Sequence, residues 1–543
     1  MTNVTAEQRI LGRDNANSLL GATRRDFLRA AAAAPALGAF YFGYKAMGEM
    51  KPVKAAVIGT GNEGCGAMIH DHNRDYLNYI GYCDARPSNQ ERAKKEFASH
   101  PQYTKADVEA LKQYPDIDAI CADKDVEVLV IALPLWLHAP VAIQAMNAGK
   151  HVFCEKLMAH NVGQCKEMIR VAHEKNVLLA IGHQRHYSAL YENANYLVQN
   201  GHLGEIRHIR ALWHRNNATP MIAKEGGNLK YESDGVTPVY LRDEAGNIKY
   251  YDGWKPDIAL ADKNIDYKKY GYKDLDELMR WRLYNRTGAG LMAELGSHQL
   301  DACSIFLGKK HPLAVTGIGG TYFYTDGREV DDHVFVNYEF PGKDYVVGEK
   351  DKGDHVVVSY SSINTNEFEK YGEEVMGTRG TMIVEGEKEL MLYKEIDRNT
   401  WKAGSARTTS INVESKGAKP TVETSPSTAG PTAASSYGGL ATADPSRGYR
   451  EELEHFASCI RHGDPKDYHA GAKLSKTDLA KDEAAQAITP RCRGEVAMAD
   501  AIIALVSNMS MREKRRIEFE ESWFDYKSQV VPDKSGAEIK TKA

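Results

Sequence analysis

Cysteine is scarce and unpaired in this sequence. The eight cysteines in 543 residues form no CxxC pair, and no His/Cys spacing is typical of zinc or haem. These spacings support neither a disulfide framework nor a metal cluster, so we predict no metal site. A basic surface is missing as well, because the net charge is −5 and no basic block carries interleaved aromatic residues. We therefore expect no nucleic-acid partner.

A long hydrophobic run is also missing. The alanine-rich stretch 30–42 is short for a full membrane span. It follows Thr23–Arg29 (TRRDFLR), and paired arginines before a mildly hydrophobic stretch are typical of a twin-arginine signal. We therefore predict that residues 1–50 are a leader and that the Tat export machinery carries the folded protein to the periplasm.

Two alternatives to simple export stay open. The arginine pair can be a chance feature of a cytoplasmic protein. In an exported protein, Ala34–Ala36 offers small residues for cleavage, but Phe40–Phe42 prolongs the apolar run. An uncleaved leader would retain the protein at the membrane.

The first half of the chain alternates between two kinds of element. At 543 residues the chain is long enough for two or three domains, each with its own core. Short apolar strands and helical segments alternate through residues 51–176, which is typical of a parallel sheet with helices on both faces. We predict an α/β fold whose first domain is a Rossmann domain at 51–176. Its expected strands are 55–58, 79–83, 126–132 and 151–154.

The second half has longer amphipathic strands that follow one another. They predict a C-terminal α/β domain at 177–530 with a large, mostly antiparallel open sheet. The expected strands are 206–213, 314–324, 334–340, 356–361, 374–384 and an edge strand at 517–519, with helices at 449–461 and 495–512. Two stretches, about 216–280 and 405–447, lack periodic elements and are predicted as insertions, and 531–543 as a tail.

A glycine-rich loop follows the first strand. Ala55–Ile58 leads directly into the sequence GTGNEG and then into a segment that can begin a helix. Glycines at these spacings allow the tight turn, the close approach of a pyrophosphate and close packing of helix on strand. Phosphates would bind the free N–H groups of the helix N-terminus. The expected cofactor-binding residues here are Gly59, Thr60, Gly61, Asn62, Glu63 and Gly64.

The next strand ends in an acid. Asp84 stands 20 positions after Gly64, where a carboxylate can accept hydrogen bonds from the adenosine ribose hydroxyls. Asp84 would repel a 2′-phosphate, whereas Arg86 is the kind of group that could hold one. We therefore favour NAD and leave NADP open.

A second group of polar residues stands on one expected helix. Glu294, His298 and Asp301 are spaced i, i+4 and i+7, which places them on one helix face behind a glycine-rich entry. An imidazole oriented by a carboxylate suits the removal of a hydroxyl proton near neutral pH. Lys156, from the first domain, could stabilise the developing oxyanion. The alternative is a helix that buries its leucines and solvates its polar side.

Several of these segments together resemble one family. The loop 59–64, Gly149–Lys156 (GKHVFCEK), Gly182–Arg185 and Glu294–Asp301 are similar to the glucose–fructose oxidoreductase/inositol dehydrogenase (Gfo/Idh/MocA) family, as are 449–456 and 499–515. The resemblance covers about 52–519, apart from the two insertions. It implies a Rossmann domain, an open-sheet domain used for homodimer or homotetramer contacts, a nicotinamide nucleotide, and a sugar or polyol substrate.

The family's pattern also assigns residues. Lys156 corresponds to the lysine of the EKP-type motif, His298 to the general base and Glu294 to the acid four residues before it. Two departures stand out, because Leu157 replaces the motif's proline and Glu294 replaces the usual aspartate. The resemblance implies further cofactor contacts at Pro134, His138, Glu155 and Lys156, and substrate contacts at Arg185 and Asp301.

The function expected from the sequence is an exported NAD(P)-dependent oxidoreductase. It would transfer hydride between the nicotinamide and a secondary hydroxyl or ketone of a sugar, glycoside or cyclitol. Exported members of the family keep their nucleotide bound, so the resemblance implies a tightly held cofactor. Two alternatives are kept: a glycosidase that oxidises its substrate transiently, and a non-catalytic, nucleotide-bound sugar-binding protein.

Overall fold

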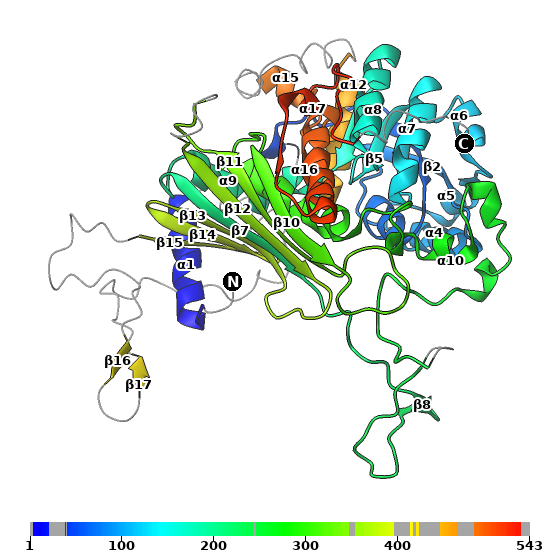
Figure 1. Cartoon of the computed structure of the whole chain (residues 1–543). Helices are drawn as coiled ribbons and strands as arrows, with labels where there is room; N and C mark the ends of the chain where they lie inside the picture. Colours follow the sequence, from blue (N-terminus) through cyan, green and yellow to red (C-terminus); the bar gives the residue numbers. More distant parts are fainter. Residues whose placement is uncertain are drawn as a thin grey trace.

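Two large sheets and the helices around them form the body of the protein (Figure 1). The computed structural model describes residues 4–20, 39, 41–242, 246–346, 353–395, 413–415, 420–422, 446–464 and 483–533. The predicted twin arginines and most of the predicted insertion at 405–447 lie outside the described residues, as does the end of the predicted tail.

The first sheet confirms the predicted Rossmann topology. Its strands are β1 (Val53–Ile58), β2 (Leu77–Cys83), β3 (Lys112–Gln113), β4 (Val128–Ile131), β5 (His151–Glu155) and β6 (Leu179–Gly182). They pair in the order β3-β2-β1-β4-β5-β6, and every pair is parallel. Because β6 is hydrogen-bonded to β5, this domain extends to about Gly182 instead of ending at 176.

Helices separate the strands of this sheet. A π-helical turn, η1 (Gly64–Ile69), follows β1, and η2 (Leu135–Leu137) and η3 (Gln184–Tyr187) follow β4 and β6. The longer helices are α4 (Pro87–Ser99), α5 (Lys105–Ala110), α6 (Ile117–Ala122), α7 (His138–Asn147), α8 (Val162–Lys175) and α12 (Tyr449–His462). The apolar strands β1 and β4 are buried on both faces, as expected of a sheet covered on both sides.

The second sheet is mostly antiparallel, as predicted. Its eight strands run in the order β15-β14-β13-β7-β12-β11-β10-β18, and only β12 and β7 pair in parallel among them. They are β7 (Ile206–His214), β10 (Ala314–Gly320), β11 (His333–Pro341), β12 (His355–Ile363), β13 (Tyr371–Gly377), β14 (Gly380–Glu385), β15 (Glu389–Lys394) and β18 (Ile517–Glu518). The segment predicted as one strand at 374–384 is the hairpin of β13 and β14.

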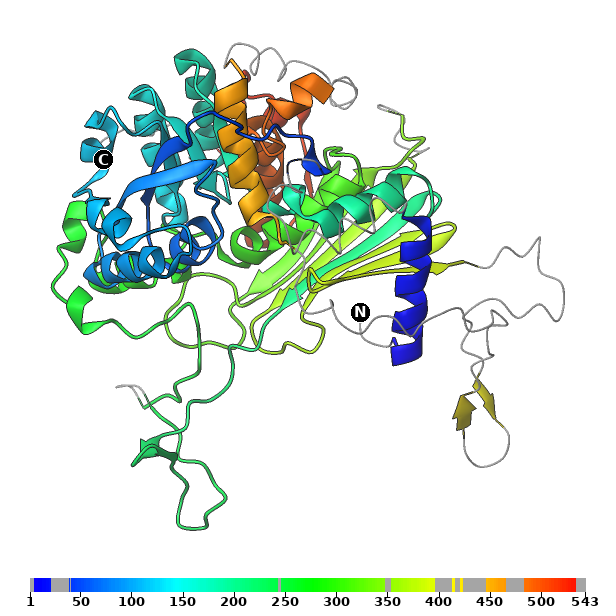
Figure 2. The ribbon, with the colours of Figure 1, turned by 180° about the vertical axis from the view of Figure 1, so that it is seen from behind.

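One face of this sheet is covered by helices, and the other is partly exposed, although Leu212, Ile383 and Met391 are buried there beside Val4. Helices α9 (Ala189–Gln199), α11 (Ser297–Phe306) and α16 (Gly494–Glu513) pack on the covered face (Figure 2). Strand β11 alternates buried and exposed residues, so Phe335 and, on β12, Val357 reach solvent. That the partly exposed face makes dimer or tetramer contacts stays a prediction.

The predicted insertion at 216–280 has two parts. Residues 216–242 and 246–251 form a long irregular ribbon that projects from the body and includes β8 (Lys224–Glu225) and β9 (Asn228–Leu229) (Figure 1). The chain then returns to the Rossmann domain through η4 (Leu260–Asp262), η5 (Tyr267–Tyr270), α10 (Leu275–Met279) and η6 (Trp281–Leu283). The remaining short elements are β16 (Val413–Ser415), β17 (Pro420–Val422), α15 (Glu483–Ala487), α17 (Glu521–Phe524) and the π-helical η7 (Met292–Gly296).

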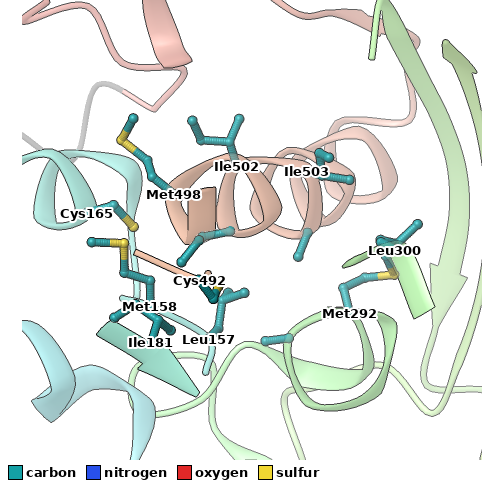
Figure 3. Close-up of a cluster of buried hydrophobic side chains, with 14 of the residues drawn as sticks. Leu157, Met158, Cys165, Ile181, Met292, Leu300, Cys492, Met498, Ile502 and Ile503 are labelled. Carbon is teal, nitrogen blue, oxygen red and sulfur yellow. The ribbon is translucent and has the colours of Figure 1, made fainter. Parts of the chain in front are cut away.

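A common apolar core joins the two domains. Helix α16 lies between α8 of the first domain and β10 of the second. Figure 3 shows Met498, Ile502 and Ile503 of α16 beside Met158 and Leu300. Among the described residues, α16 alone is long and apolar enough to cross a membrane, but 78% of that window is buried inside the protein. It is therefore a core helix.

Two described parts of the first fifty residues, 4–20 and 41–47, pack against the body of the protein, and that residues 1–50 are a leader stays a prediction. Helix α1 (Ala6–Leu19) lies against β15, and its Arg9 forms ion pairs with Glu385 and Glu389. Residues 41–47 pack on α12, where Phe42 and Tyr44 are buried and the Tyr44 hydroxyl donates a hydrogen bond to Glu454. Whether the segment between them directs export is a separate question.

Glu454→Gln should remove a pH-dependent loss of stability. Burial raises the pKa of the Glu454 carboxyl from its usual 4.5 to about 7, although Tyr44 and Asn73 hydrogen-bond to it. The folded protein then holds a proton that the unfolded chain has released, so stability falls as the pH rises from 4.5 through 7. Relative to the variant, the wild type should lose roughly 2–3 kcal/mol between pH 5 and pH 8.

Urea unfolding at the two pH values measures this difference. Glu91→Gln is the matched control, because the Glu91 side chain is 63% exposed and its removal should shift both curves alike. If the wild type and the Glu454 variant differ by the same amount at pH 5 and pH 8, the buried carboxyl is not the cause.

Candidate active site

The glycine-rich loop has the geometry that a bound pyrophosphate requires. Gly59 has φ +89°, and a Cβ there would lie 2.4 Å from the Ala132 carbonyl oxygen. A Cβ on Gly64 would lie 1.9 Å from the Gly59 carbonyl oxygen, so strand and helix meet only because both residues are glycine. At Gly61 the nearest atom would be 3.9 Å away, which leaves its backbone open to a ligand. Asn62 and Glu63 at the loop tip are exposed.

Asp84 closes the adenosine end of the site. Its carboxylate accepts hydrogen bonds from the backbone N–H of Thr60 (2.6 Å) and Arg86 (2.8 Å) and from the Asn89 amide (3.1 Å). Burial raises the pKa of the Asp84 carboxyl, and these hydrogen bonds oppose the rise. Each carboxylate oxygen can accept more than one donor, so Asp84 retains acceptor capacity for ribose hydroxyls.

Lys156 crosses from the first domain to the second. Its Nζ donates to the backbone carbonyl of Glu294 (2.8 Å), and the Lys156–Leu157 peptide bond is cis. Burial lowers the pKa of the Lys156 amine, while the nearby carboxylates of Glu294 and Glu155 oppose the shift. The Glu155 carboxyl lies against Gly182, where a Cβ would be 2.7 Å from Oε1, and its own pKa is raised by burial.

His298 lies near Lys156 at the start of α11. Its ring centroid is 5.4 Å from that of Trp213, and its Nδ1 has no hydrogen-bond partner among the described residues. Burial and the neighbouring Lys156 and Arg185 cations hold the pKa of His298 well below 6.5. The imidazole is therefore neutral near pH 7 and can accept a proton.

The three polar residues predicted on one helix face have different partners. Glu294 lies in the π-helical turn η7, which changes its spacing to His298, and its carboxylate accepts from Arg282 Nε (2.6 Å). Asp301 lies with His298 in α11 and contacts His186 Nε2 (2.9 Å) and Lys309 Nζ (2.6 Å). No carboxylate in the described residues orients His298, contrary to the expectation.

Arg185 and Asp301 are buried parts of the scaffold, so the structure does not place them as substrate contacts. The Arg185 guanidinium pairs with Glu373 (2.8 Å) and Glu387 (2.9 Å) and donates to the His298 carbonyl (2.7 Å). Its side chain is only 1% exposed. These bonds hold the start of α11, and with it the His298 imidazole, against the second sheet.

His138 also serves the scaffold. The side chain is buried, and its two ring nitrogens lie 2.8 Å from the carbonyl oxygens of Leu157 and Leu133. It thereby connects the loop after β5, which carries Lys156, to the loop that contains Pro134. Both ring nitrogens are engaged by backbone carbonyls, and the contact of His138 with a nucleotide stays a prediction.

A buried polar group lies behind His298. Ligand atoms of His183, Asp301 and Asp500 fall within 4.8 Å of one another. The Lys309 ammonium lies 2.6 Å from Asp301 and 3.3 Å from Asp500, so a cation of the chain itself occupies the space between the two aspartates. We assign this group to the scaffold and not to a metal centre.

Two site residues were not found from the sequence. Asp262 accepts from Arg86 and comes from the predicted insertion at 216–280, whereas Arg282, which pairs with Glu294, stands just after it. That stretch has no periodic pattern that could have placed them. Trp213, whose ring neighbours that of His298, lies on a predicted strand, but no motif in the sequence indicated that it is a site residue.

The fold and this site define a two-domain dinucleotide-binding protein, and comparison with known families gives its class. The model of the oxidoreductase family with an NAD-binding Rossmann fold, GFO_IDH_MocA, matches residues 53–183. The GFO/IDH/MocA C-terminal domain model matches residues 264–383. Parts of both domains of this chain therefore match models of the Gfo/Idh/MocA family.

Individual relatives match over part of their length. An uncharacterised oxidoreductase of Schizosaccharomyces pombe is 31% identical over 160 residues, 29% of this chain and 40% of that protein. Inositol 2-dehydrogenase of Salmonella typhimurium is 32% identical over 212 residues, 37% of this chain and 57% of the relative. The chain thus spans about half the length of these curated relatives.

A solved structure shows the same fold over most of the chain. The aldose-aldose oxidoreductase from Caulobacter crescentus, complexed with glycerol, has a TM-score of 0.51 at 17% identity. The match covers 86% of this chain and all of that chain. At this identity the likeness concerns the fold alone.

Lys309→Met should destabilise the protein strongly. The change removes the ammonium that lies between Asp301 and Asp500 and leaves two carboxyls buried together. Breaking a buried ion pair from one side typically costs about 3–5 kcal/mol. Urea unfolding measures the loss of stability.

Lys105→Met provides the matched control. That lysine is 91% exposed and lies 3.8 Å from Glu109, so its loss should change stability by less than about 0.5 kcal/mol. If Lys309→Met costs no more than this control, the ammonium does not neutralise the aspartate pair.

Proposed function

We propose that this chain is an NAD-dependent oxidoreductase that transfers hydride between a nicotinamide nucleotide and a secondary hydroxyl or ketone of a sugar, glycoside or cyclitol. One observation carries the proposal: Lys156, at the carboxyl end of β5, reaches across to the Glu294 backbone four residues before His298. Ligands of doubly wound sheets bind at these strand ends. A buried base, His298, and a buried hydrogen-bond donor, Lys156, therefore lie near the place expected for a nicotinamide.

The residues present fit a nicotinamide nucleotide. The open backbone at Gly61 can take the pyrophosphate, and Asp84 can take the adenosine ribose. A bound nicotinamide supplies the acceptor or donor of the hydride. The chain's own contribution is proton transfer and positioning of the substrate oxygen.

Neutral His298 is the base in this proposal. In the oxidation direction its imidazole takes the hydroxyl proton as the hydride leaves the same carbon. The Lys156 ammonium donates a hydrogen bond to the substrate oxygen and stabilises the negative charge that develops there. Arg282 holds the Glu294 carboxylate beside this pair, which keeps the site balanced in charge.

The substrate class rests on relatives. The chain is similar to an inositol 2-dehydrogenase over 212 residues, and the aldose-aldose oxidoreductase shares its fold. Cyclitols and aldoses both carry secondary hydroxyls that a neutral imidazole can deprotonate beside an ammonium group. These similarities support the proposed class without selecting one member of it.

Lys156→Met and His298→Ala should each reduce turnover by about 10²- to 10⁴-fold, the range for a lost general acid–base group. The assay is NADH formation with a panel of aldoses, glycosides and cyclitols, with NADH binding measured in parallel. Lys105→Met and His70→Ala are the matched controls, because both side chains are more than half exposed. If neither site variant lowers turnover, the assignment is wrong. Free sugar released without net NADH would instead favour the transient-redox glycosidase.

We further propose that the protein is exported with its cofactor bound. The support is the TRRDFLR sequence before an alanine-rich stretch. In a bacterium with a Tat system, the full chain should appear in the periplasm, and mass spectrometry of the denatured protein should find stoichiometric NAD. Changing Arg24 and Arg25 together to lysine should hold it in the cytoplasm, whereas Arg13→Lys should not. Wild-type protein found only in the cytoplasm would contradict export.

A further inference from the structure

A carboxylate from the second domain is buried in the first. Asp262, at the end of η4, is fully buried. Its Oδ1 accepts from the Ser88 backbone N–H (3.0 Å), and its Oδ2 accepts from the Ser88 hydroxyl (2.6 Å) and Arg86 Nε (3.0 Å). Burial acts to raise the pKa of Asp262, but the hydrogen bonds from Ser88 and Arg86 outweigh it and leave the pKa below its usual value. Asp262 is therefore an anion.

The three donors form an anion site. Ser88 lies in the first turn of the 13-residue helix α4, where free backbone N–H groups and the helix dipole attract negative charge. Its hydroxyl and the Arg86 guanidinium add to the same attraction. The site is occupied by a negative group, Asp262, which is direct evidence that it binds anions.

This anion site adjoins the adenosine ribose. Asp84, the residue placed to accept from the ribose hydroxyls, is bonded to the backbone N–H of Arg86, whose side chain reaches Asp262. A phosphate on the ribose 2′-oxygen would need these same donors. Asp84 and Asp262 together bring two negative charges against the single positive charge of Arg86.

We propose that Asp262 is a cofactor-specificity residue, whose carboxylate occupies the site that a 2′-phosphate would need and thereby selects NAD over NADP. The inference rests on the nucleotide function proposed above. It also reverses the part that Arg86 was expected to play, since Asp262 engages the guanidinium that could otherwise bind NADP.

The segment that carries Asp262 is held firmly on the Rossmann domain. Trp136, in the loop after β4, donates its indole N–H to the Tyr272 hydroxyl (3.2 Å). The Arg286 guanidinium lies over the Trp136 ring, with its Cζ 4.8 Å from the ring centroid. The Asp262 carboxylate therefore has a fixed position and does not need nucleotide to bring it into place.

Asp262→Asn in the full chain tests the inference, with NADH and NADPH affinities measured by calorimetry. The wild type should bind NADH at least about tenfold more tightly than NADPH. The variant should reduce that ratio by about tenfold or more, chiefly through tighter NADPH binding, because Arg86 and Ser88 are released. Adding Arg86→Ala to the variant should abolish the gain. Asp257→Asn, on the same segment but 88% exposed, should leave the ratio unchanged.

Three outcomes would overturn the inference. The first is a wild type that binds NADPH as tightly as NADH, and the second is a folded Asp262→Asn protein with an unchanged ratio. If the asparagine variant does not fold, Asp262→Ser is measured instead. Its hydroxyl is a neutral acceptor for the same donors, and an unchanged affinity ratio would again overturn the inference. The third is a wild type that binds neither nucleotide, which would refute the proposed function itself and is thereby distinguishable from the other two.

Discussion

The contact of the Lys156 ammonium with the backbone of η7 is the interaction on which the site depends. A buried ammonium requires hydrogen-bond acceptors, and Lys156 finds its closest one in the Glu294 carbonyl, 2.8 Å away in the other domain. The contact fixes the strand end of the Rossmann sheet against the helix that carries His298. Apolar packing around α16 supplies the area that holds the domains together, but it is not directional. The polar contact, in contrast, fixes the position of Lys156 relative to the segment that leads into His298.

Buried ion pairs next to the site also help to fix the position of His298. Arg185 anchors the His298 backbone to Glu373 and Glu387, and Lys309 anchors Asp301, so the first turns of α11 are fixed on two sides. Removing water from these groups strengthens each contact and also depresses the pKa of His298. The scaffold that positions the imidazole therefore also keeps it neutral. The same buried charges therefore determine both the position of the His298 imidazole and its protonation state.

The sequence predicted the parts of the molecule that follow regular patterns. Strands such as β1 and β5, the glycine loop and the positions of Lys156 and His298 could all be placed, because period, length and glycine spacing report directly on backbone geometry. The contacts of Asp301 could not be predicted, because spacing places a residue on a helix face but does not identify a partner from elsewhere in the chain such as Lys309. The hydrogen bonds of His138 could not be predicted either, because family position says where a residue stands and not which way its hydrogen bonds run. The docking of α1 and residues 41–47 was missed because a leader-like composition does not exclude packing.

The proposed cofactor selectivity rests on contacts of one irregular segment. Between residues 252 and 286 the chain runs along the carboxyl ends of the Rossmann strands and meets both ends of the site. Asp262 contacts the start of α4 at the adenosine end, and Arg282 holds Glu294 at the catalytic end. A segment without regular structure can do this because its contacts are individual ion pairs and ring contacts, anchored midway at Trp136. Since the sheet and the glycine loop do not depend on these contacts, cofactor choice and substrate fit can change there without disturbing the fold.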